Sequence, residues 1–270
     1  PVCITAAQSA DSRSVKPVPE ARAWRSHGDG MVALVAGAAG GIGAALGAEI
    51  LERYRLRRLF VVSRGDAPAG FAAERVVALR ADLLAPGATV ELARSVAGFE
   101  PRLDLVFNCC GLLHDGALKP EKSVAAIDAG ALERLFAVNA TLPALLARDL
   151  GPLLRRSPDA VFASLSARVG SIADNRAGGW YGYRASKAAH NMLLRTLALE
   201  WRHAQPRTVC LMLQPGTVVT PLSRPFLSAR THEHAMTPAQ AARHLLDVVE
   251  RVAPADSGSF LDWQGRAVPW

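Results

Sequence analysis

The 270-residue sequence lacks several features that mark whole classes of protein. No apolar stretch reaches the roughly 18 residues that a membrane-spanning helix needs. There is no long block of lysine and arginine and no nucleic-acid-binding motif. The formal net charge of +7 is therefore interpreted as solvated surface. These absences predict a protein that binds neither membranes nor nucleic acids.

Cysteine is scarce, and its spacing fits neither a disulfide framework nor a metal site. The sequence has four cysteines without a CxxC pair among them: Cys3, Cys109, Cys110 and Cys210. His232 and His234 have no helical i, i+4 partner and no third ligand nearby, so we expect no metal. Unpaired cysteines are typical of a reducing compartment, and we expect a cytoplasmic protein.

The first 30 residues differ from the rest of the chain. They are polar and rich in serine, proline and arginine, and they lack both hydrophobic periodicity and the apolar core of a secretory signal. Neither a repeat nor a Pro/Gly-rich linker follows them. We therefore expect residues 1–30 to be a disordered extension and residues 31–270 to form one domain.

From Met31 onward, short apolar runs alternate with segments of helical length. The expected strands are 31–36, 58–63, 75–79, 103–107, 159–165, 208–214 and 258–262. The expected helices are 41–54, 88–97, 131–148, 183–202 and 238–251. This alternation predicts βαβ units, and the continuous apolar runs are typical of parallel strands that are buried on both faces. The expected fold class is α/β: a single Rossmann-type, doubly wound domain with a parallel sheet of about seven strands.

Glycines crowd the turn between the first expected strand and the first helix. Gly37, Gly41 and Gly43 have GxxxGxG spacing, and Ile42 lies between the last two. Residues without Cβ allow a tight turn and let a pyrophosphate approach the backbone, while the helix N-terminus offers free N–H groups. Because the loop joins a strand to a helix, it indicates dinucleotide binding. We expect all four residues to contact the cofactor.

The end of the second expected strand distinguishes NAD from NADP. An NAD site usually has an acidic residue about 20 residues after the glycines, to hold the ribose 2′-hydroxyl. This sequence has Ser63 and Arg64 there, and Asp66 lies too far on, in a loop. A guanidinium pairs with a 2′-phosphate through a planar fork. The pattern favours NADP(H), with NAD(H) as the alternative.

Tyr183 and Lys187 lie four residues apart and therefore share one face of an expected helix. A tyrosine ordinarily titrates near pH 10, too high for ready proton exchange at neutral pH. A nearby ammonium favours the phenolate, so we expect Lys187 to lower the pKa of Tyr183. Lys187 is also expected to hydrogen-bond the nicotinamide ribose, so both residues are catalytic and cofactor-binding candidates.

Together these motifs resemble the short-chain dehydrogenase/reductase family, in its classical type. The glycine spacing is similar to the family's TGxxxGxG loop, with Ala36 in the place of the threonine. Tyr183 and Lys187 match the family's Tyr-x-x-x-Lys pair. The resemblance covers residues 31–270 and implies the Rossmann fold expected above.

The resemblance implies further cofactor contacts where the strands end. Asp82 matches the aspartate that contacts the adenine ring, with Leu83 beside it. Asn108 and Gly111 match the NNAG segment after the fourth strand, with two cysteines between them. The segment after the sixth strand would face the nicotinamide carboxamide, through Pro215, Gly216, Val218 and Thr220.

The resemblance also implies a catalytic serine and a catalytic asparagine. In the family a serine pair ends the fifth strand, and its second member, Ser166 here, is catalytic. Ser171 is the rival, because its distance from Tyr183 along the chain is closer to the family's usual spacing. The position at the strand end favours Ser166. Asn139 stands where the family has a helix distortion whose backbone holds a proton-relay water beside the lysine.

The implied function is NADP(H)-dependent interconversion of a carbonyl and an alcohol on a small molecule, with Tyr183 as general acid and base. Stretches 170–181 and 260–265 are similar to the C-factor/sniffer-like carbonyl reductase branch. That likeness keeps an alternative open, a cofactor-binding signalling protein of C-factor type with little or no turnover. The family implies a homodimer or homotetramer. Substrate specificity is expected from residues 168–180 and 221–237, and the basic character of the second segment favours an anionic substrate.

Overall fold

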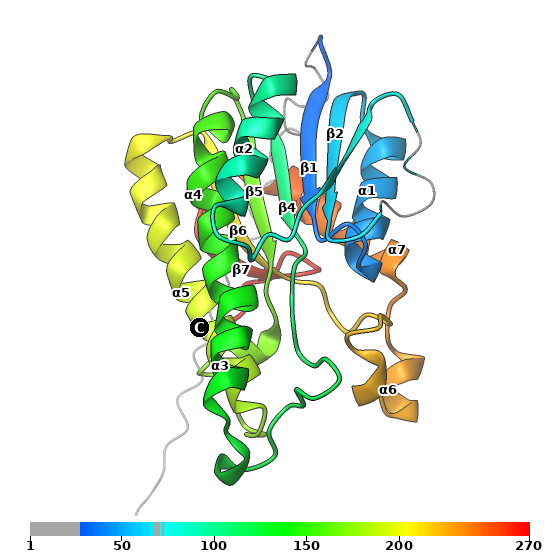
Figure 1. Ribbon diagram of the computed structural model, residues 1–270, viewed down its shortest axis with the longest axis vertical. Helices are drawn as coiled ribbons and strands as arrows, with labels where there is room; N and C mark the ends of the chain where they lie inside the picture. The colour runs from blue at the N-terminus through cyan, green and yellow to red at the C-terminus, as the bar shows by residue number, and fades with distance from the viewer. Residues whose placement is uncertain (1–27, 67–70, 72) are drawn as a thin grey trace, which may run out of the picture.

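The computed structural model describes residues 28–66, 71 and 73–270, and its centre is a seven-stranded parallel sheet (Figure 1). The strands are β1 (Met31–Ala36), β2 (Leu56–Ser63), β3 (Val76–Arg80), β4 (Leu105–Asn108), β5 (Ala160–Leu165), β6 (Thr208–Gln214) and β7 (Ser259–Asp262). Their order is β3-β2-β1-β4-β5-β6-β7, and every neighbouring pair is parallel. The order reverses direction between β1 and β4, as in a doubly wound Rossmann sheet. The predicted fold class is confirmed, and each expected strand is present within two residues at its ends.

Helices cover both faces of the sheet, as the continuous apolar strands require. They are α1 (Gly41–Arg53), α2 (Ala88–Phe99), α3 (Ala129–Phe136), α4 (Leu142–Leu154), α5 (Tyr181–Ala204), α6 (Ala229–Glu233) and α7 (Pro238–Arg251). Successive side chains of β1 point to opposite faces of the sheet. Met31, Ala33 and Val35 pack in the apolar cluster on the face that α1 and α7 cover. Val32 and Leu34 pack in the cluster that α2, α4 and α5 cover. Each face thus has its own apolar core.

The expected helix 131–148 is interrupted. A π-helical turn at Ala137–Thr141 separates α3 from α4, and Leu142 N–H donates to the carbonyl of Ala137. The prediction of one continuous helix was wrong in this detail, because the apolar spacing of the two helices continues across the turn. The turn matches the distortion that was expected around Asn139.

The other segments differ less from expectation. Residues 1–27 of the predicted extension lie outside the described residues. Asp29 pairs with Arg102 through both carboxylate oxygens, so the described chain is already anchored just before β1. Within the expected loop 221–237 the structure has a 3₁₀ turn at Arg224–Phe226 and the short helix α6. In the described part of the chain, no helix combines the length and apolar character needed to cross a bilayer.

Candidate active site

The carboxyl ends of the strands meet at one edge of the sheet, and the glycine loop lies at its centre. Gly37 has a φ of +79°, a left-handed conformation that favours glycine. A Cβ on Gly43 would lie 2.2 Å from the carbonyl oxygen of Gly37. A Cβ on Gly37 would lie 3.0 Å from the backbone of Cys109 and Cys110. The loop therefore needs glycine at both positions to bring β1, α1 and the end of β4 together.

This loop fits the pyrophosphate of a dinucleotide. The helix α1 begins at Gly41 and no side chain caps its N-terminus, so the N–H groups of its first turn, with Ile42 and Gly43 among them, face outward without intrahelical acceptors. A Cβ on Gly41 would lie 3.0 Å from Cγ2 of Thr220, which places the segment after β6 beside the loop. The missing side chains leave a concave backbone surface, where a phosphate can approach closely.

Two arginines lie at the neighbouring ends of β2 and β3. Arg64 is exposed, and its carbonyl accepts a hydrogen bond of 3.1 Å from Nε of Arg80, the last residue of β3. Ser63 pairs in register with Arg80, and its hydroxyl donates to the carbonyl of Gly65. The sequence analysis missed Arg80, because its importance comes from the alignment of β3 with β2. Arg64 and Arg80 therefore lie next to each other at the ends of β2 and β3, and both carry a guanidinium group that could pair with a phosphate.

Two other predicted cofactor residues lie at the ends of strands. The carboxylate of Asp82 accepts from the backbone N–H of Leu84. The side chain of Leu83, the residue between them, is buried. After β6, Gly216 has a φ of +82°, and a Cβ there would lie 2.4 Å from Cε of Met236. Val218 is buried and forms a parallel bridge with Met236. The segment that starts at Pro215 is thus fastened to the stretch before α7.

Tyr183 and Lys187 are both buried on α5, with 8% and 3% of their surfaces exposed. Nζ of Lys187 lies 6.0 Å from the centre of the Tyr183 ring and donates to the carbonyl of Leu165 at 2.9 Å. Burial lowers the pKa of Lys187 to about 8 and raises the pKa of Tyr183 to about 12. The predicted lowering of the tyrosine pKa was wrong for the protein alone, because burial removes solvent from the phenol and raises its pKa.

The two serine candidates lie in different surroundings. Ser166 directly follows β5 and is 4% exposed, and its hydroxyl donates to Oδ1 of Asn191 on α5 at 2.6 Å. The hydroxyl of Ser171 donates to the carbonyl of Trp270 and accepts from the N–H of Asp174. Ser166 therefore faces the helix that carries Tyr183, whereas Ser171 is bonded to its own loop and to the end of the described chain.

Asn139 connects the π-helical turn with the segment after β4. Its Oδ1 accepts from Leu112 N–H at 2.8 Å, and its Nδ2 donates to the Leu112 carbonyl at 2.7 Å and to the hydroxyl of Ser186 at 3.1 Å. A Cβ on Gly111 would lie 3.8 Å from Oδ1 of Asn139 and 4.0 Å from Nζ of Lys187. The structure thus brings Gly111, Asn139 and Lys187 together.

A buried polar chain, missed in the sequence analysis, links the end of β4 with Ser166. Nδ2 of Asn108 donates to the hydroxyl of Ser164 at 2.9 Å, and that hydroxyl lies 2.8 Å from Nε2 of His190. Nδ1 of His190 lies 3.4 Å from Oδ1 of Asn191, the partner of Ser166. The one available signal was position, since residues 190 and 191 follow Lys187 by about one turn on the same helix face.

An aromatic cluster covers the ring of Tyr183. The rings of Tyr183 and Trp180 have centroids 6.2 Å apart, and Trp180 contacts Phe226 at 5.1 Å. Phe226 also contacts His114 at 5.3 Å, and Nε2 of His114 lies 3.2 Å from the carbonyl of Leu222. These contacts join the two predicted specificity segments directly above the tyrosine. Trp180 is the one non-glycine residue with positive φ in the described chain.

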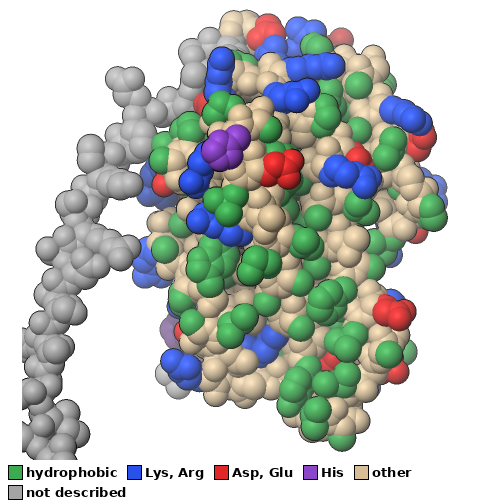
Figure 2. Space-filling model, turned by 90° about the vertical axis from the view of Figure 1, so that its left-hand side faces the viewer, with side chains coloured by type: hydrophobic (Ala, Val, Ile, Leu, Met, Phe, Trp, Pro, Cys, Tyr) green, Lys and Arg blue, Asp and Glu red, His purple; other side chains and the backbone are tan. Residues whose placement is uncertain are grey.

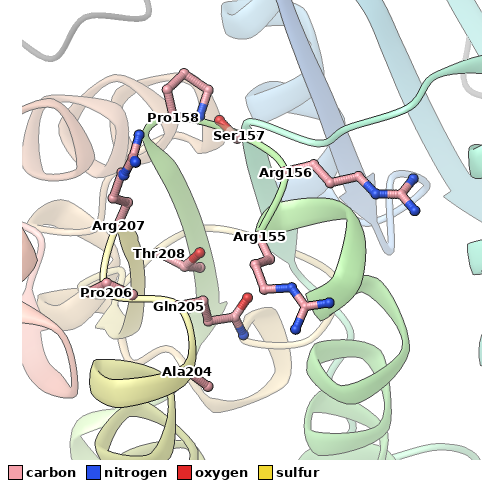
Figure 3. A pocket seen from close by; sticks show the side chains of 9 residues that line it. All are labelled: Arg155, Arg156, Ser157, Pro158, Ala204, Gln205, Pro206, Arg207 and Thr208. Carbon is pink, nitrogen blue, oxygen red and sulfur yellow. The ribbon is translucent and has the colours of Figure 1, made fainter.

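A separate pocket of about 390 Å³ lies at the opposite edge of the sheet, where β5 and β6 begin (Figure 3). Three arginines line it, Arg155, Arg156 and Arg207. The side chains of Arg156 and Arg207 point away from each other in Figure 3, so they do not converge on one anion. The pocket is not part of the site at the carboxyl ends. Among the described residues, no cluster of three His, Cys, Asp or Glu side chains could hold a metal.

The family model of the short chain dehydrogenases matches residues 31–231. The C-signal of Myxococcus xanthus is 35% identical over 145 residues, which cover 53% of this chain and 81% of that protein. The 1-hydroxy-2-glutathionyl-2-methyl-3-butene dehydrogenase of Rhodococcus sp. (strain AD45) is 31% identical over 205 residues, which cover 70% of this chain and 84% of that protein.

Solved structures share the fold. The NADPH-bound carbonyl reductase from chicken fatty liver has a TM-score of 0.76 at 24% identity, and covers 88% of this chain and 98% of its own. The carbonyl reductase Sniffer of D. melanogaster has a TM-score of 0.76 at 22% identity, with 89% and 99% covered. A short-chain dehydrogenase/reductase from Burkholderia multivorans with bound NADP has a TM-score of 0.73 at 27% identity, with 89% and 99% covered. Because the family model spans well over half of it, the chain belongs to the short-chain dehydrogenase family, and the prediction of an NAD(P)-dependent oxidoreductase of this family is confirmed.

Proposed function

We propose that the chain interconverts a carbonyl and an alcohol, with NADP(H) as its cofactor and Tyr183 as the general acid and base. The observation that carries this proposal is the buried pair of Tyr183 and Lys187 on α5, where Lys187 binds the carbonyl of Leu165, the residue before Ser166. The nicotinamide, when bound, supplies or accepts the hydride. The protein's own residues orient the carbonyl oxygen and deliver its proton.

The raised pKa of Tyr183 and the lowered pKa of Lys187 suit proton delivery. With its pKa raised to about 12, Tyr183 is a neutral phenol at physiological pH, and a neutral phenol is the form that donates a proton to a developing alkoxide. With its pKa lowered to about 8, Lys187 exchanges protons near neutral pH and can resupply the tyrosine. Asn139 would hold the relay water through the backbone of the π-helical turn.

Ser166 is the better candidate for the serine that donates to the carbonyl oxygen. It lies at the end of β5 against α5, one residue after the carbonyl that Lys187 binds. Ser171 already uses its hydroxyl within its loop. We expect Ser166→Ala to lower kcat by about 100-fold or more, the usual cost of losing one donor to a developing oxyanion. Ser171→Ala should leave kcat within about threefold of the wild type.

The preference for NADP(H) rests on Arg64 and Arg80, which are joined at the ends of β2 and β3 by a hydrogen bond from Nε of Arg80 to the carbonyl of Arg64. Two guanidinium groups favour a 2′-phosphate, and the site presents no carboxylate for a 2′-hydroxyl at the end of β2. The similar structures described with NADPH or NADP support the same preference. The glycine loop and the segment after β6 would hold the pyrophosphate and the nicotinamide, as the sequence predicts.

The substrate that this site favours is an uncharged carbonyl compound with an apolar substituent. Trp180 contacts Tyr183 edge-to-face, and Phe226 contacts Trp180 in the same way. Leu113 and Leu222 belong to the apolar cluster that contains Tyr183. Arg224 lies in the same 3₁₀ turn as Phe226, and its side chain is exposed to solvent. A phenyl ketone should therefore have a higher kcat/KM than its carboxylated analogue. The reverse order would support the anionic substrate expected from the basic loop.

A second candidate function is a cofactor-binding signalling protein with little turnover. The likeness to the C-signal of Myxococcus xanthus, which extends over 81% of that protein, favours it. Retention of all four catalytic residue types, Tyr183, Lys187, Ser166 and Asn139, favours the enzyme. The two functions differ in turnover, because a signalling protein would bind the dinucleotide without oxidising it.

We also propose a homodimer or homotetramer that pairs through α5 and its neighbours. Met192, Leu193 and Leu199 on α5 are 67%, 43% and 43% exposed. Figure 2 views the molecule from the side on which α5 lies in Figure 1, and hydrophobic side chains gather on the lower half of this face. Apolar surface of this kind is typical of protein interfaces. A monomeric mass by light scattering at micromolar concentration would contradict the proposal.

The proposed location is cytoplasmic. The described cysteines, Cys109, Cys110 and Cys210, are free thiols, as expected for a reducing compartment. Fractionation of cells that produce the chain would test this location directly.

The decisive experiment combines binding with turnover. NADPH and NADH are titrated by fluorescence, and the reduction of a reactive diketone is followed by the loss of cofactor absorbance. We expect tighter binding of NADPH and measurable turnover. Binding without turnover of any carbonyl would favour the signalling protein, and failure to bind either cofactor would contradict both candidates.

A further inference from the structure

Asn191 holds an unusual position in the candidate site. Its side chain is 2% exposed, and within the described part of the chain its Nδ2 is the one buried side-chain nitrogen or oxygen without a hydrogen-bond partner. A buried amide nitrogen that makes no hydrogen bond is costly. Structures that retain such a group often do so at functional sites. The neighbouring Oδ1 is the acceptor for Ser166.

The bond between Ser166 and Asn191 conflicts with the role proposed for the serine. A hydroxyl has a single hydrogen. While Ser166 donates it to Oδ1 of Asn191, at 2.6 Å, no hydrogen is left for a substrate carbonyl. Ser166 can donate to the carbonyl if Asn191 instead donates to Ser166.

Rotation of the Asn191 side-chain amide by half a turn, which exchanges its Nδ2 and Oδ1, provides this second arrangement. It places Nδ2 where Oδ1 now lies, 2.6 Å from the hydroxyl of Ser166 and 3.4 Å from Nδ1 of His190. Both amide hydrogens then have acceptors, and the one unpartnered atom becomes an oxygen. Burial lowers the pKa of His190 well below its usual range, so the ring is neutral and its Nδ1 can accept. Nε2–H of His190 then donates to Ser164.

We propose that Asn191 is a positioning residue that sets the direction of the Ser166 hydroxyl. When a carbonyl compound binds, the side-chain amide of Asn191 donates to the hydroxyl of Ser166, and that hydroxyl donates to the carbonyl oxygen. His190 holds the reversed amide through Nδ1, and Ser164 and Asn108 hold His190. This inference rests on the proposed carbonyl chemistry, but it concerns residues that the family motifs in this sequence do not include.

The test compares two isosteric substitutions, Asn191→Asp and Asn191→Leu. An ionised carboxylate only accepts, so at a pH above the pKa of the introduced carboxyl Asn191→Asp should keep Ser166 donating to it and lower kcat by about 100-fold, the cost of one lost donor to an oxyanion. Leucine neither donates nor accepts, so it leaves the Ser166 hydrogen free, and kcat should fall by no more than about tenfold. KM and the affinity for NADPH should stay within about threefold in both. Equal losses in kcat, or a larger loss for leucine, would overturn the inference.

A double-mutant cycle separates positioning from a structural role. In a Ser166→Ala background, Asn191→Asp should lower kcat no further, because its effect passes through the missing hydroxyl. Full additivity would overturn the inference. If Asn191→Asp does not fold, the comparison becomes Asn191→Ser against Asn191→Ala, where the serine hydroxyl can still donate and should retain the higher kcat. Absence of turnover in the wild type would instead contradict the proposed function, and this inference with it.

Discussion

The two edges of the parallel sheet treat buried polar side chains in different ways. At the edge where strands begin, Asp104 is fully buried and accepts from the N–H of Val32, from Ser157 and from Arg102. Glu100, 2% exposed, likewise pairs with arginines at the start of β2. At the edge where strands end, the buried Lys187 binds a backbone carbonyl, and the buried Asn191 leaves a nitrogen unpartnered.

The difference shows which edge is built for stability and which for chemistry. A buried carboxylate that accepts from several donors fixes the chain around it. A buried lysine beside a buried tyrosine has a shifted pKa, which costs stability and supplies groups that exchange protons. Substitutions at the first edge should therefore change the free energy of unfolding, and those at the second should change catalysis.

Replacement of Tyr183 by phenylalanine should give the largest effect. It removes the proton donor and keeps the ring, so we expect kcat to fall by about 100- to 10,000-fold, the contribution of a general acid. The packing with Trp180 should persist, and the free energy of unfolding should change by less than about 1 kcal/mol. Steady-state kinetics and urea unfolding provide the two measurements. A stable variant with full turnover would remove Tyr183 from the mechanism.

The opposite pattern is expected for Asp104→Ala. It leaves the N–H of Val32 and the hydroxyl of Ser157 without their acceptor and Arg102 without one of its two carboxylate partners, so unfolding should require about 3 kcal/mol less. The kcat of the folded fraction should be unchanged. Glu91→Ala is the matched control, because it breaks an exposed pair with Arg94 and should cost less than about 1 kcal/mol. A loss of kcat in Asp104→Ala without a loss of stability would contradict the claim that the edge where the strands begin serves stability and not catalysis.

Alkaline pH should stabilise the wild type relative to Lys187→Met. Folding lowers the pKa of Lys187 to about 8, so between that value and the ordinary pKa the unfolded chain binds the extra proton. Stability from this residue is therefore lost as pH falls through about 8 and regained above it. From pH 8 to about pH 10 we expect a gain of about 2 kcal/mol over the variant, from the size of the pKa shift. Tyr183 does not oppose it in this window, because its pKa is raised to about 12 and it stays protonated in both states until about pH 10.

Urea unfolding of both proteins across this pH range measures the gain. Lys187→Met is the suitable reference because methionine keeps most of the side-chain volume and does not titrate. A constant difference between the two proteins would mean that the ammonium of Lys187 is not buried in the folded protein.

The smallest of these effects concerns the cofactor. Arg64→Ala should weaken NADPH binding by about tenfold, the loss of one charge-assisted contact to the 2′-phosphate, and leave NADH binding unchanged. Arg80→Ala should act in the same direction. Arg94→Ala on α2 is the control, since its guanidinium pairs with Glu91 at the surface. If Arg64→Ala weakened the binding of NADPH and NADH equally, the guanidinium of Arg64 would not distinguish the two cofactors.

The fold was largely predictable because it rests on patterns that are local in sequence. The central strands β1, β4, β5 and β6 are buried, mostly apolar runs, and the glycine loop follows the first of them. The exception is the region of Asn139, where the π-helical turn keeps the apolar spacing, so that the family resemblance indicated the distortion and the periodicity did not.

The site was predictable only where a motif carried it. Tyr183, Lys187 and the glycines have characteristic spacing, whereas Arg80, His190 and Asn191 gain their importance from strand register and helix facing. The sign of the tyrosine pKa shift also could not be predicted, because it depends on how much solvent the folded chain removes from the ring. The aromatic contact of Trp180 with Phe226 joins two loops that are far apart in the chain.

The most direct test of the central claim is transfer of deuterium from deuterated NADPH to a phenyl ketone, followed by mass spectrometry of the product alcohol. We predict one deuterium on the carbinol carbon with the wild type and almost none with Tyr183→Phe, at NADPH concentrations that saturate both proteins. If the wild type bound NADPH and no carbonyl compound ever acquired the label, the chain would not be a carbonyl reductase. The signalling function would then be the better account of the same fold.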